Sequence, residues 1–262
     1  MNTLLAIAAT TSLLTASVAA SQPEGPKILL VHGAFADASS WNGVIEILEK
    51  EGYCVIAVAN PLRGVKNDAQ YVTDVVTGIK SPVVLVGHSY GGSVISEVRA
   101  PNVKALVYVA AFAPEVGETA AGLSGKFPGS TLGSALAASI ALSGGGKDLY
   151  IQHSKFHDQF AADVSAKAAI AMAVGQRPIT EAALNEAASE PAWKSIPSWF
   201  IYGDHDKNIP PQVLAFMAER AQSRQTEIVR GASHVVMVSN PKAVAKMIER
   251  AATAHREVAS QQ

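Results

Sequence analysis

The feature that most constrains this chain is a short aliphatic run that leads straight into a glycine-rich turn around one serine. Residues 83–86 read VVLV, residues 87–92 read GHSYGG, and a helix-forming stretch follows. Glycines allow a strand and a helix to approach closely at a sharp turn, because they carry no side chain. Such a turn holds its central residue, Ser89, in a strained backbone conformation with the hydroxyl clear of the main chain. The pattern therefore predicts a nucleophile elbow, a strand-turn-helix unit that presents a serine to a substrate.

A serine hydroxyl is a weak nucleophile until a base removes its proton, so the chain must also supply a histidine and a group that orients it. Asp204 and Asp206 follow an aliphatic run at 199–202, and His234 follows another at 226–229. These positions lie just past predicted strands, at the edge where open α/β sheets place their sites, and the order serine, aspartate, histidine is the expected one. The other histidines lack this combination of position and order and are predicted to be structural or solvated: His32, His88, His153, His157, His205 and His255.

Short aliphatic runs alternate with amphipathic stretches from residue 27 onward. Strands are predicted at residues 28–31, 53–59, 83–86, 105–109, 199–202 and 226–229, with helices between them such as 41–50 and 69–79. This alternation predicts parallel strands joined by right-handed helical crossovers. The unbroken, β-branched character of the runs indicates that both faces of the sheet are covered. The expected fold class is therefore α/β, with a mostly parallel sheet of about six strands and helices on both faces.

The alternation stops between residues 114 and 193, a stretch rich in alanine, glycine and serine. Helices are predicted at 161–173 and 181–189, and no convincing strand is visible. The stretch is too long for a plain loop, so we expect a helical cap insertion at 114–193 over a core formed by 27–113 and 194–254. Its apolar residues could roof a pocket, although for any single one packing onto the sheet is favoured: Leu132, Leu136, Ile140, Leu142, Leu149, Phe156, Phe160 and Met172.

Composition limits the function classes. The 262 residues are 48% hydrophobic and 16% charged, which is typical of one globular domain with a sizeable core. Because 21 basic side chains balance 22 acidic ones, no basic field favours nucleic acid, and a small molecule is the expected partner. The single cysteine, Cys54, excludes an internal disulfide and a site of several thiolates, and it is expected to be buried. The sequence has no metal-binding spacing, Walker-type loop or dinucleotide fingerprint, so we expect no metal and no cofactor.

The first residues read as a targeting segment. Residues 1–20 carry no charged side chain and end in the small residues SVAA, which is typical of a secretory signal cleaved near Ala20, although no lysine or arginine precedes the apolar stretch. A membrane anchor, which needs about 20 apolar residues, and a disordered leader are the alternatives. We expect residues 21–26 to be a linker and the protein to be periplasmic or secreted, without stable membrane association. A cytoplasmic location is the alternative.

Together these motifs resemble the α/β-hydrolase fold over residues 27–252. Within that superfamily the chain is similar to the small, cofactor-free branch that includes plant methylesterases, hydroxynitrile lyases and bacterial hydrolases. The stretches that carry the resemblance are 31–34, the turn around Ser89, 110–118, 156–164 and the segments of Asp206 and His234. The resemblance implies the catalytic residues, the oxyanion hole and the reaction described next.

The resemblance implies a catalytic triad of Ser89, His234 and Asp206. In this family the acid usually stands three residues after the position of Gly203 and shortly before a proline, which selects Asp206. Asp204 is then expected to be a turn residue that accepts hydrogen bonds from local backbone amides. The assignment predicts that Asp206 touches the histidine and that Asp204 does not.

An oxyanion hole needs two backbone N–H groups aimed at one point. The amide of Tyr90 directly follows the serine and is one candidate, and the resemblance implies that of Ala34 as the second. Gly33 would let that loop pass close to a substrate. Phe35 is a weaker candidate for a substrate-binding residue on the pocket wall.

Two departures from the hydroxynitrile lyases favour ester hydrolysis. By resemblance, those enzymes carry a lysine directly after the histidine and a threonine in place of Gly33, whereas this chain has Val235 and Gly33. Haloalkane dehalogenases of this fold use an aspartate nucleophile, so Ser89 argues against them. We expect a serine esterase that cleaves a small or medium ester, lactone or aryl ester through an acyl-enzyme on Ser89. A lyase, a cofactor-free perhydrolase and a ligand-binding protein without catalysis are the alternatives.

Overall fold

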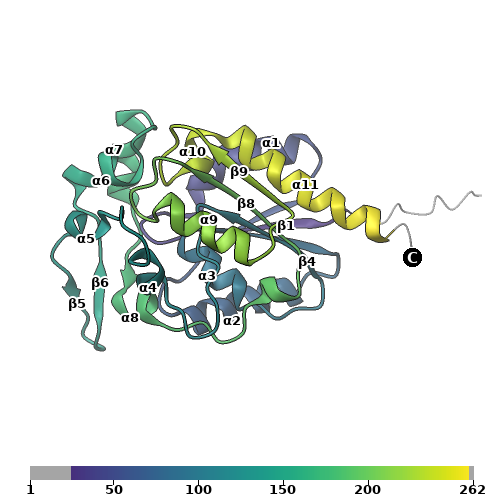
Figure 1. The fold of residues 1–262 in the computed structure, drawn as a ribbon, viewed down its shortest axis with the longest axis horizontal. Coiled ribbons are helices and arrows are strands. Elements are labelled where there is room, and N and C mark those ends of the chain that lie inside the picture. The colour runs from purple at the N-terminus through teal and green to yellow at the C-terminus, as the bar shows by residue number, and fades with distance from the viewer. Residues whose placement is uncertain (1–24, 260–262) are drawn as a thin grey trace, which may run out of the picture.

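The computed structural model describes residues 25–259, and at their centre lies a six-stranded sheet with helices on both faces (Figure 1). The strands lie in the order β2-β1-β3-β4-β8-β9, and every neighbouring pair is parallel. Their bounds are β1 Lys27–Val31, β2 Val55–Val58, β3 Val83–His88, β4 Val103–Val109, β8 Ser198–Gly203 and β9 Gln225–Val229. The predicted α/β class and the parallel sheet of six strands are confirmed.

Burial of the strands follows their place in the sheet. β3 is buried at every residue, as expected for an aliphatic run with both faces covered. The edge strand β9 instead alternates between half-buried and exposed residues, because its cover is incomplete. The expectation of a buried Cys54 is wrong: the residue is exposed, because it directly precedes the other edge strand, β2.

Helices cover the two faces of the sheet in separate groups (Figure 1). On one face α1 (Asn42–Lys50), α10 (Val236–Ser239) and α11 (Pro241–Ala259) pack together, and on the other α2 (Val65–Thr77) packs against α3 (Tyr90–Ser96). The helix α9 (Pro211–Arg220) packs against β8, and short 3-10 helices span Ala38–Trp41 and Ala192–Lys194. None of the described helices is long and apolar enough to cross a membrane.

Residues 120–185, between β4 and β8, lie at one end of the sheet, at the left of Figure 1. Their helices are α4 Ala120–Ser124, α5 Leu132–Ala135, α6 His153–Phe160, α7 Ala166–Gly175 and α8 Glu181–Asn185. They also contain a small antiparallel sheet of β5 (Ile140–Ala141), β6 (Lys147–Leu149) and β7 (Ile179–Thr180). The expectation of a stretch without strands is therefore wrong, because strands of two or three residues are too short to show an alternating pattern.

Two further expectations concern the ends of segments. The helix predicted at 161–173 begins at Ala166, because the Ser165 hydroxyl accepts a hydrogen bond from the Ala168 N–H and caps it there. The predicted signal segment at 1–20 lies outside the described residues, as does most of the predicted linker at 21–26.

Candidate active site

Ser89 stands at the sharp turn between β3 and α3. Its backbone has φ 53° and ψ −123°, a conformation that costs energy for a residue with a Cβ. The Ser89 N–H donates to the Val109 carbonyl at 3.3 Å, and the Ser89 carbonyl accepts from the N–H groups of Gly92 and Phe112 at 2.9 and 3.1 Å. Hydrogen bonds to the neighbouring strand and its following loop therefore hold the strained turn in place.

The glycines around this turn sit where a side chain does not fit. A Cβ on Gly91 would lie 2.4 Å from a carbonyl oxygen of β1, and a Cβ on Gly92 would lie 2.3 Å from the Phe112 carbonyl oxygen. A Cβ on Gly33 would lie 2.6 Å from that of Ser89. The absence of side chains at these positions lets the loop after β1 lie directly against the serine.

Asp206 and His234 come from the loops after β8 and β9 and contact each other. His234 Nδ1 lies 2.6 Å from Asp206 Oδ2, and both side chains are almost fully buried. The second carboxylate oxygen accepts the N–H groups of Asn208 and Ile209 at 2.8 and 2.9 Å. Because both carboxylate oxygens accept hydrogen bonds, the Asp206 side chain is fixed in position. The His234 imidazole then carries its proton on Nδ1, which donates to Asp206, and Nε2 is the basic nitrogen.

Asp204 lies on the same loop as Asp206 but points elsewhere. It is exposed, and its Oδ1 accepts the N–H of Gly231 at 2.6 Å. The side chain thus joins two loops of the backbone, in the manner of a turn residue. The structure brings Asp206, and not Asp204, to His234.

Ser89 and His234 line one cavity of about 250 Å³, together with Ala34, Phe35 and Tyr90. The hydrogen bond of the His234 imidazole within the described part of the chain goes to Asp206 and not to the serine hydroxyl, and catalytic hydrogen bonds of this kind often tighten only when substrate is bound. Apolar side chains form much of the remaining wall: Phe112, Leu132, Leu136, Leu184 and Ile209. Among the described residues, no aspartate, glutamate, lysine or arginine lines this cavity, so its wall suits an uncharged ligand.

The apolar insertion residues divide between wall and core. Leu132 and Leu136 line the cavity, whereas Phe156 and Phe160 are fully buried and Ile140 is 52% exposed. The Phe160 ring packs beside the His234 imidazole, with 5.1 Å between the ring centroids. Packing was therefore the right interpretation for Phe156 and Phe160.

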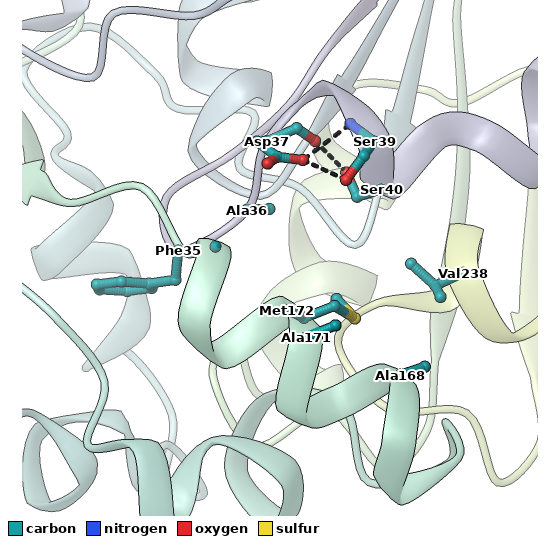
Figure 2. A pocket seen from close by; sticks show the side chains of 10 residues that line it. Phe35, Ala36, Asp37, Ser39, Ser40, Ala168, Ala171, Met172 and Val238 are labelled. Atoms are coloured by element: carbon teal, nitrogen blue, oxygen red, sulfur yellow. Dashed lines mark hydrogen bonds between the residues drawn. The ribbon is translucent and has the colours of Figure 1, made fainter.

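A second cavity of about 180 Å³ shares Phe35 with the first (Figure 2). It is walled by Met172 and other residues of α7 and by Asp37, which accepts hydrogen bonds from the N–H and the hydroxyl of Ser39. Figure 2 shows the Phe35 ring pointing away from these residues. No histidine stands on the described wall of this cavity, so the candidate active site is the cavity at Ser89.

Two backbone donors lie beside the serine. Neither the Ala34 N–H nor the Tyr90 N–H donates to an acceptor within residues 25–259, and both residues line the cavity. The N–H of Phe35, in contrast, donates to the Arg177 carbonyl at 2.9 Å. Free donors beside a serine form a candidate oxyanion hole.

Two buried histidines support these loops from behind. His32 Nδ1 bonds to the Gly33 carbonyl at 2.9 Å, its Nε2 accepts the Asn60 N–H at 3.2 Å, and burial lowers the pKa of His32. His88 Nε2 lies 3.1 Å from the His234 carbonyl. Burial, followed by repulsion from His234, lowers the pKa of His88 well below 6.5, so its imidazole is neutral and donates that hydrogen bond. Both histidines are structural, as the sequence pattern predicts.

A side-chain contact that no sequence pattern shows anchors the residue after the serine. The Tyr90 hydroxyl donates to Asp68 Oδ2 at 2.9 Å, and the same carboxylate accepts the Arg63 N–H. Burial raises the pKa of Asp68. No sequence pattern links Asp68 to Tyr90, because they stand on different helices.

Within the described residues, no three histidine, cysteine or acidic side chains gather closely enough to hold a metal ion.

Comparisons with known proteins agree with this architecture. The sequence matches the model of the alpha/beta hydrolase family over residues 28–247. The alpha/beta hydrolase nvfD of Aspergillus novofumigatus (strain IBT 16806) is 28% identical over 87% of this chain and 96% of its own length. The alpha-hydroxynitrile lyase of Arabidopsis thaliana is 24% identical over 86% of this chain and 96% of its own length. The crystal structure of a pyrethroid hydrolase from Sphingobium faniae JZ-2 is similar, with a TM-score of 0.69 and 22% identity over 88% of this chain and 99% of the other.

Proposed function

The chain belongs to the alpha/beta hydrolase family, and we propose that it is a serine esterase acting on a small or medium carboxylic ester. The observation that carries the proposal is the 2.6 Å contact of Asp206 with His234, because His234 lines the same cavity as Ser89. The cavity of about 250 Å³ is smaller than the roughly 300–1,000 Å³ of pockets for drug-sized ligands. Its size and uncharged wall favour a small neutral ester, lactone or aryl ester.

In the proposed reaction, His234 Nε2 takes the proton of the Ser89 hydroxyl as Oγ attacks the ester carbonyl carbon. The resulting oxyanion accepts hydrogen bonds from the N–H groups of Ala34 and Tyr90. The bond to the alkoxy oxygen breaks, His234 protonates the leaving alcohol, and the acyl group remains on Ser89. Water then gives a proton to His234 and attacks the acyl carbon, the bond from that carbon to Ser89 Oγ breaks, and His234 returns the proton to Oγ as the acid leaves. Asp206 orients the imidazole and stabilises its positive charge in both halves of the reaction.

The similarity to a hydroxynitrile lyase makes that activity the competing proposal. Two positions weigh against it. Val235, directly after His234, is fully buried and carries no charge, and a side chain in place of Gly33 would collide with Ser89. The lysine and threonine expected of such lyases therefore have no counterpart beside the serine. Hydrolysis remains the proposal that the residues of the cavity favour.

Labelling with a serine-directed fluorophosphonate, read by intact mass, tests the proposal. We expect one adduct on the wild type, none on Ser89→Ala, and one on the matched control Ser154→Ala, whose serine is exposed on α6. A panel of esters should then give acid and alcohol, and cyanohydrins should give no cyanide. Release of cyanide, or peracid formation from acid and peroxide in place of hydrolysis, would replace the esterase proposal by a lyase or a perhydrolase.

We also propose that the leader at residues 1–20 directs export to the periplasm or the medium. Its apolar composition and small terminal residues support this proposal. The intact mass of protein recovered from an exporting host should be lower by about twenty residues. A full-length mass would contradict cleavage.

A further inference from the structure

The side-chain amide of Asn208 borders the proposed ester cavity and has an N–H group without a partner among the described residues. Asn208 lies in the loop after β8 that also carries Asp206, called here the acid loop. Asn208 lines the cavity and is only 3% exposed. Its carboxamide oxygen accepts a hydrogen bond from Gln159 Nε2 at 2.8 Å. Its amide nitrogen, Nδ2, donates to no acceptor among the described residues and is not among the atoms fully enclosed by protein. Asn208 lines none of the other described cavities, so the accessible surface of this nitrogen is assigned to this one.

The neighbours of Asn208 determine which end of its amide faces the cavity. Gln159 Nε2 also contacts the Lys207 carbonyl oxygen at 2.9 Å. A carbonyl oxygen only accepts, so the Gln159 atom beside it must be the nitrogen. The Thr131 hydroxyl, 2.8 Å from Gln159 Oε1, donates to the other end of the same amide. Because Gln159 presents an N–H to Asn208, the atom that meets it is Oδ1, and the NH2 group of Asn208 is left for the cavity.

We propose that Asn208 is a specificity-determining residue whose NH2 group donates a hydrogen bond to a second oxygen of the substrate. This inference rests on the proposed esterase function and narrows its substrate class. A buried donor without a partner costs free energy, so an ester lacking the second oxygen leaves Nδ2 unsatisfied. The side chains around it are largely apolar, among them Leu132 and Ile209, so few other groups compete for the contact. The preferred substrate is an ester that carries a ketone oxygen in its acyl or alcohol part.

The experiment compares esters that differ in one oxygen. A linear alkyl ester is measured beside analogues with a ketone at successive carbons of the acyl chain, and then of the alcohol chain. Each kcat/KM is divided by the rate of alkaline hydrolysis of the same ester, which removes the intrinsic effect of the ketone on reactivity. We expect the wild type to prefer the ketone at one position by about tenfold, the factor that one neutral hydrogen bond supports.

Variants assign this preference to the Asn208 amide. Asn208→Leu, which has similar volume and no donor, should lower kcat/KM for the preferred ketone ester about tenfold more than for the alkyl ester. Ser130→Ala is the matched control, because the Ser130 hydroxyl lines the cavity and donates to the Asn208 carbonyl, not to its side chain. In this control both esters should change by the same factor.

The outcomes separate the inference from the function on which it rests. A wild type that hydrolyses every ester in the series without preference overturns the role of Asn208 and leaves the esterase proposal intact. A preference that survives in Asn208→Leu has the same consequence. If Asn208→Leu does not fold, the wild-type series decides alone. Failure of the wild type to hydrolyse any ester, together with an unlabelled Ser89, overturns both proposals.

Discussion

The sheet core and the insertion at 114–193 differ in what holds them together. β3 is buried at every residue, whereas both residues of β5 in the insertion are exposed. Polar contacts tie the insertion to the core, including the Arg63 side chain with Asp148 and the Thr180 hydroxyl with the Arg63 carbonyl. The core is thus stabilised mainly by continuous apolar burial, and the insertion depends more on individual hydrogen bonds and ion pairs.

The same division separates the candidate chemistry from the candidate specificity. Ser89, Asp206 and His234 all stand at the carboxyl edge of core strands, whereas Leu132, Leu136 and Leu184 of the insertion line the cavity. A core site under a separate wall allows the wall to vary while the reacting groups keep their geometry. The comparison therefore predicts large effects on turnover and folding in the core, and small or selective effects in the insertion.

The largest effect is expected at the acid of the proposed triad. Asp206→Asn should lower kcat about a thousandfold or more, because the asparagine amide no longer holds the His234 proton on Nδ1. Asp204→Asn should change kcat less than about threefold, because Asp204 bonds only to a backbone amide of the neighbouring loop. Steady-state kinetics on one ester checks both. Reversed effects would move the acid to Asp204 and contradict the geometry.

The next largest effect is the loss of stability expected when a glycine is replaced by alanine in the core, compared with the same replacement in the insertion. A Cβ on Gly92 would lie 2.3 Å from the Phe112 carbonyl oxygen, whereas one on Gly144 would meet nothing within 4 Å. Gly92→Ala should lower the free energy of unfolding by about 3 kcal/mol or more, since the obstacle is backbone. Gly144→Ala should stay within about 0.5 kcal/mol of the wild type. Denaturant titration measures both, and equal losses would remove the distinction between a tightly packed core and an open insertion.

The contrast also explains what could be predicted from the sequence. The core strands could be found because a parallel strand with both faces covered is a continuous aliphatic run, as at 83–86. The strands β5, β6 and β7 have two or three residues each, too few for any periodicity. The start of α7 was available in principle, since Ser165 is a typical N-cap residue. Cys54 was misplaced because a sequence does not show which strand forms the edge.

The features of the candidate site also divide into those that could be predicted from the sequence and those that could not. The sequence allows the prediction that Ser89, Asp206 and His234 lie at the same edge of the sheet, because the carboxyl ends of parallel strands share one edge. The Tyr90 hydroxyl on Asp68 and the Asn208 amide at the cavity could not. These side chains depend on contacts between elements that are remote in sequence, and their orientation follows from hydrogen-bond partners and not from a motif.

A smaller effect is expected from the pH dependence of stability. The native pKa of His88 lies well below 6.5, mainly because the imidazole is buried. Between that lowered pKa and 6.5 the unfolded chain binds a proton that the native protein does not. The contribution of neutral His88 to the free energy of unfolding is therefore complete above pH 6.5. It is lost as the pH falls below 6.5, by about 1.4 kcal/mol per pH unit.

The variant His88→Gln should flatten this acid slope relative to the wild type. His32 contributes with the same sign in both proteins, so it cancels in the difference. His153→Gln in the insertion is the matched control, because its imidazole is exposed, and its slope should equal that of the wild type. Denaturant titrations at several pH values measure the slopes. A flattened slope in His153→Gln alone would place the acid sensitivity in the insertion and break the comparison.

The smallest effect concerns the ion pair that joins the two regions. Arg63, between β2 and α2, contacts Asp148 of β6 at 2.6 Å and donates to the Pro178 carbonyl at 2.8 Å. The Arg63 side chain is 38% exposed and that of Asp148 is 11% exposed, so water screens the pair and its contribution should be about 1 kcal/mol. Asp148→Asn should speed amide hydrogen exchange in β5, β6 and β7 about fivefold and leave β3 unchanged, because only the small sheet opens.

The pair of Lys207 with Asp158 is the matched control for that experiment. It also joins the acid loop to the insertion, at 2.9 Å, but the Asp158 side chain is 85% exposed, so Asp158→Asn should leave exchange unchanged in both regions. If Asp148→Asn accelerates exchange in β3 and in the small sheet equally, the core and the insertion open as one unit. Acceleration confined to the insertion means that the cavity wall can open while the strands that carry Ser89, Asp206 and His234 stay closed. A wall that moves independently can admit substrates of different shape without loss of the geometry that the chemistry requires.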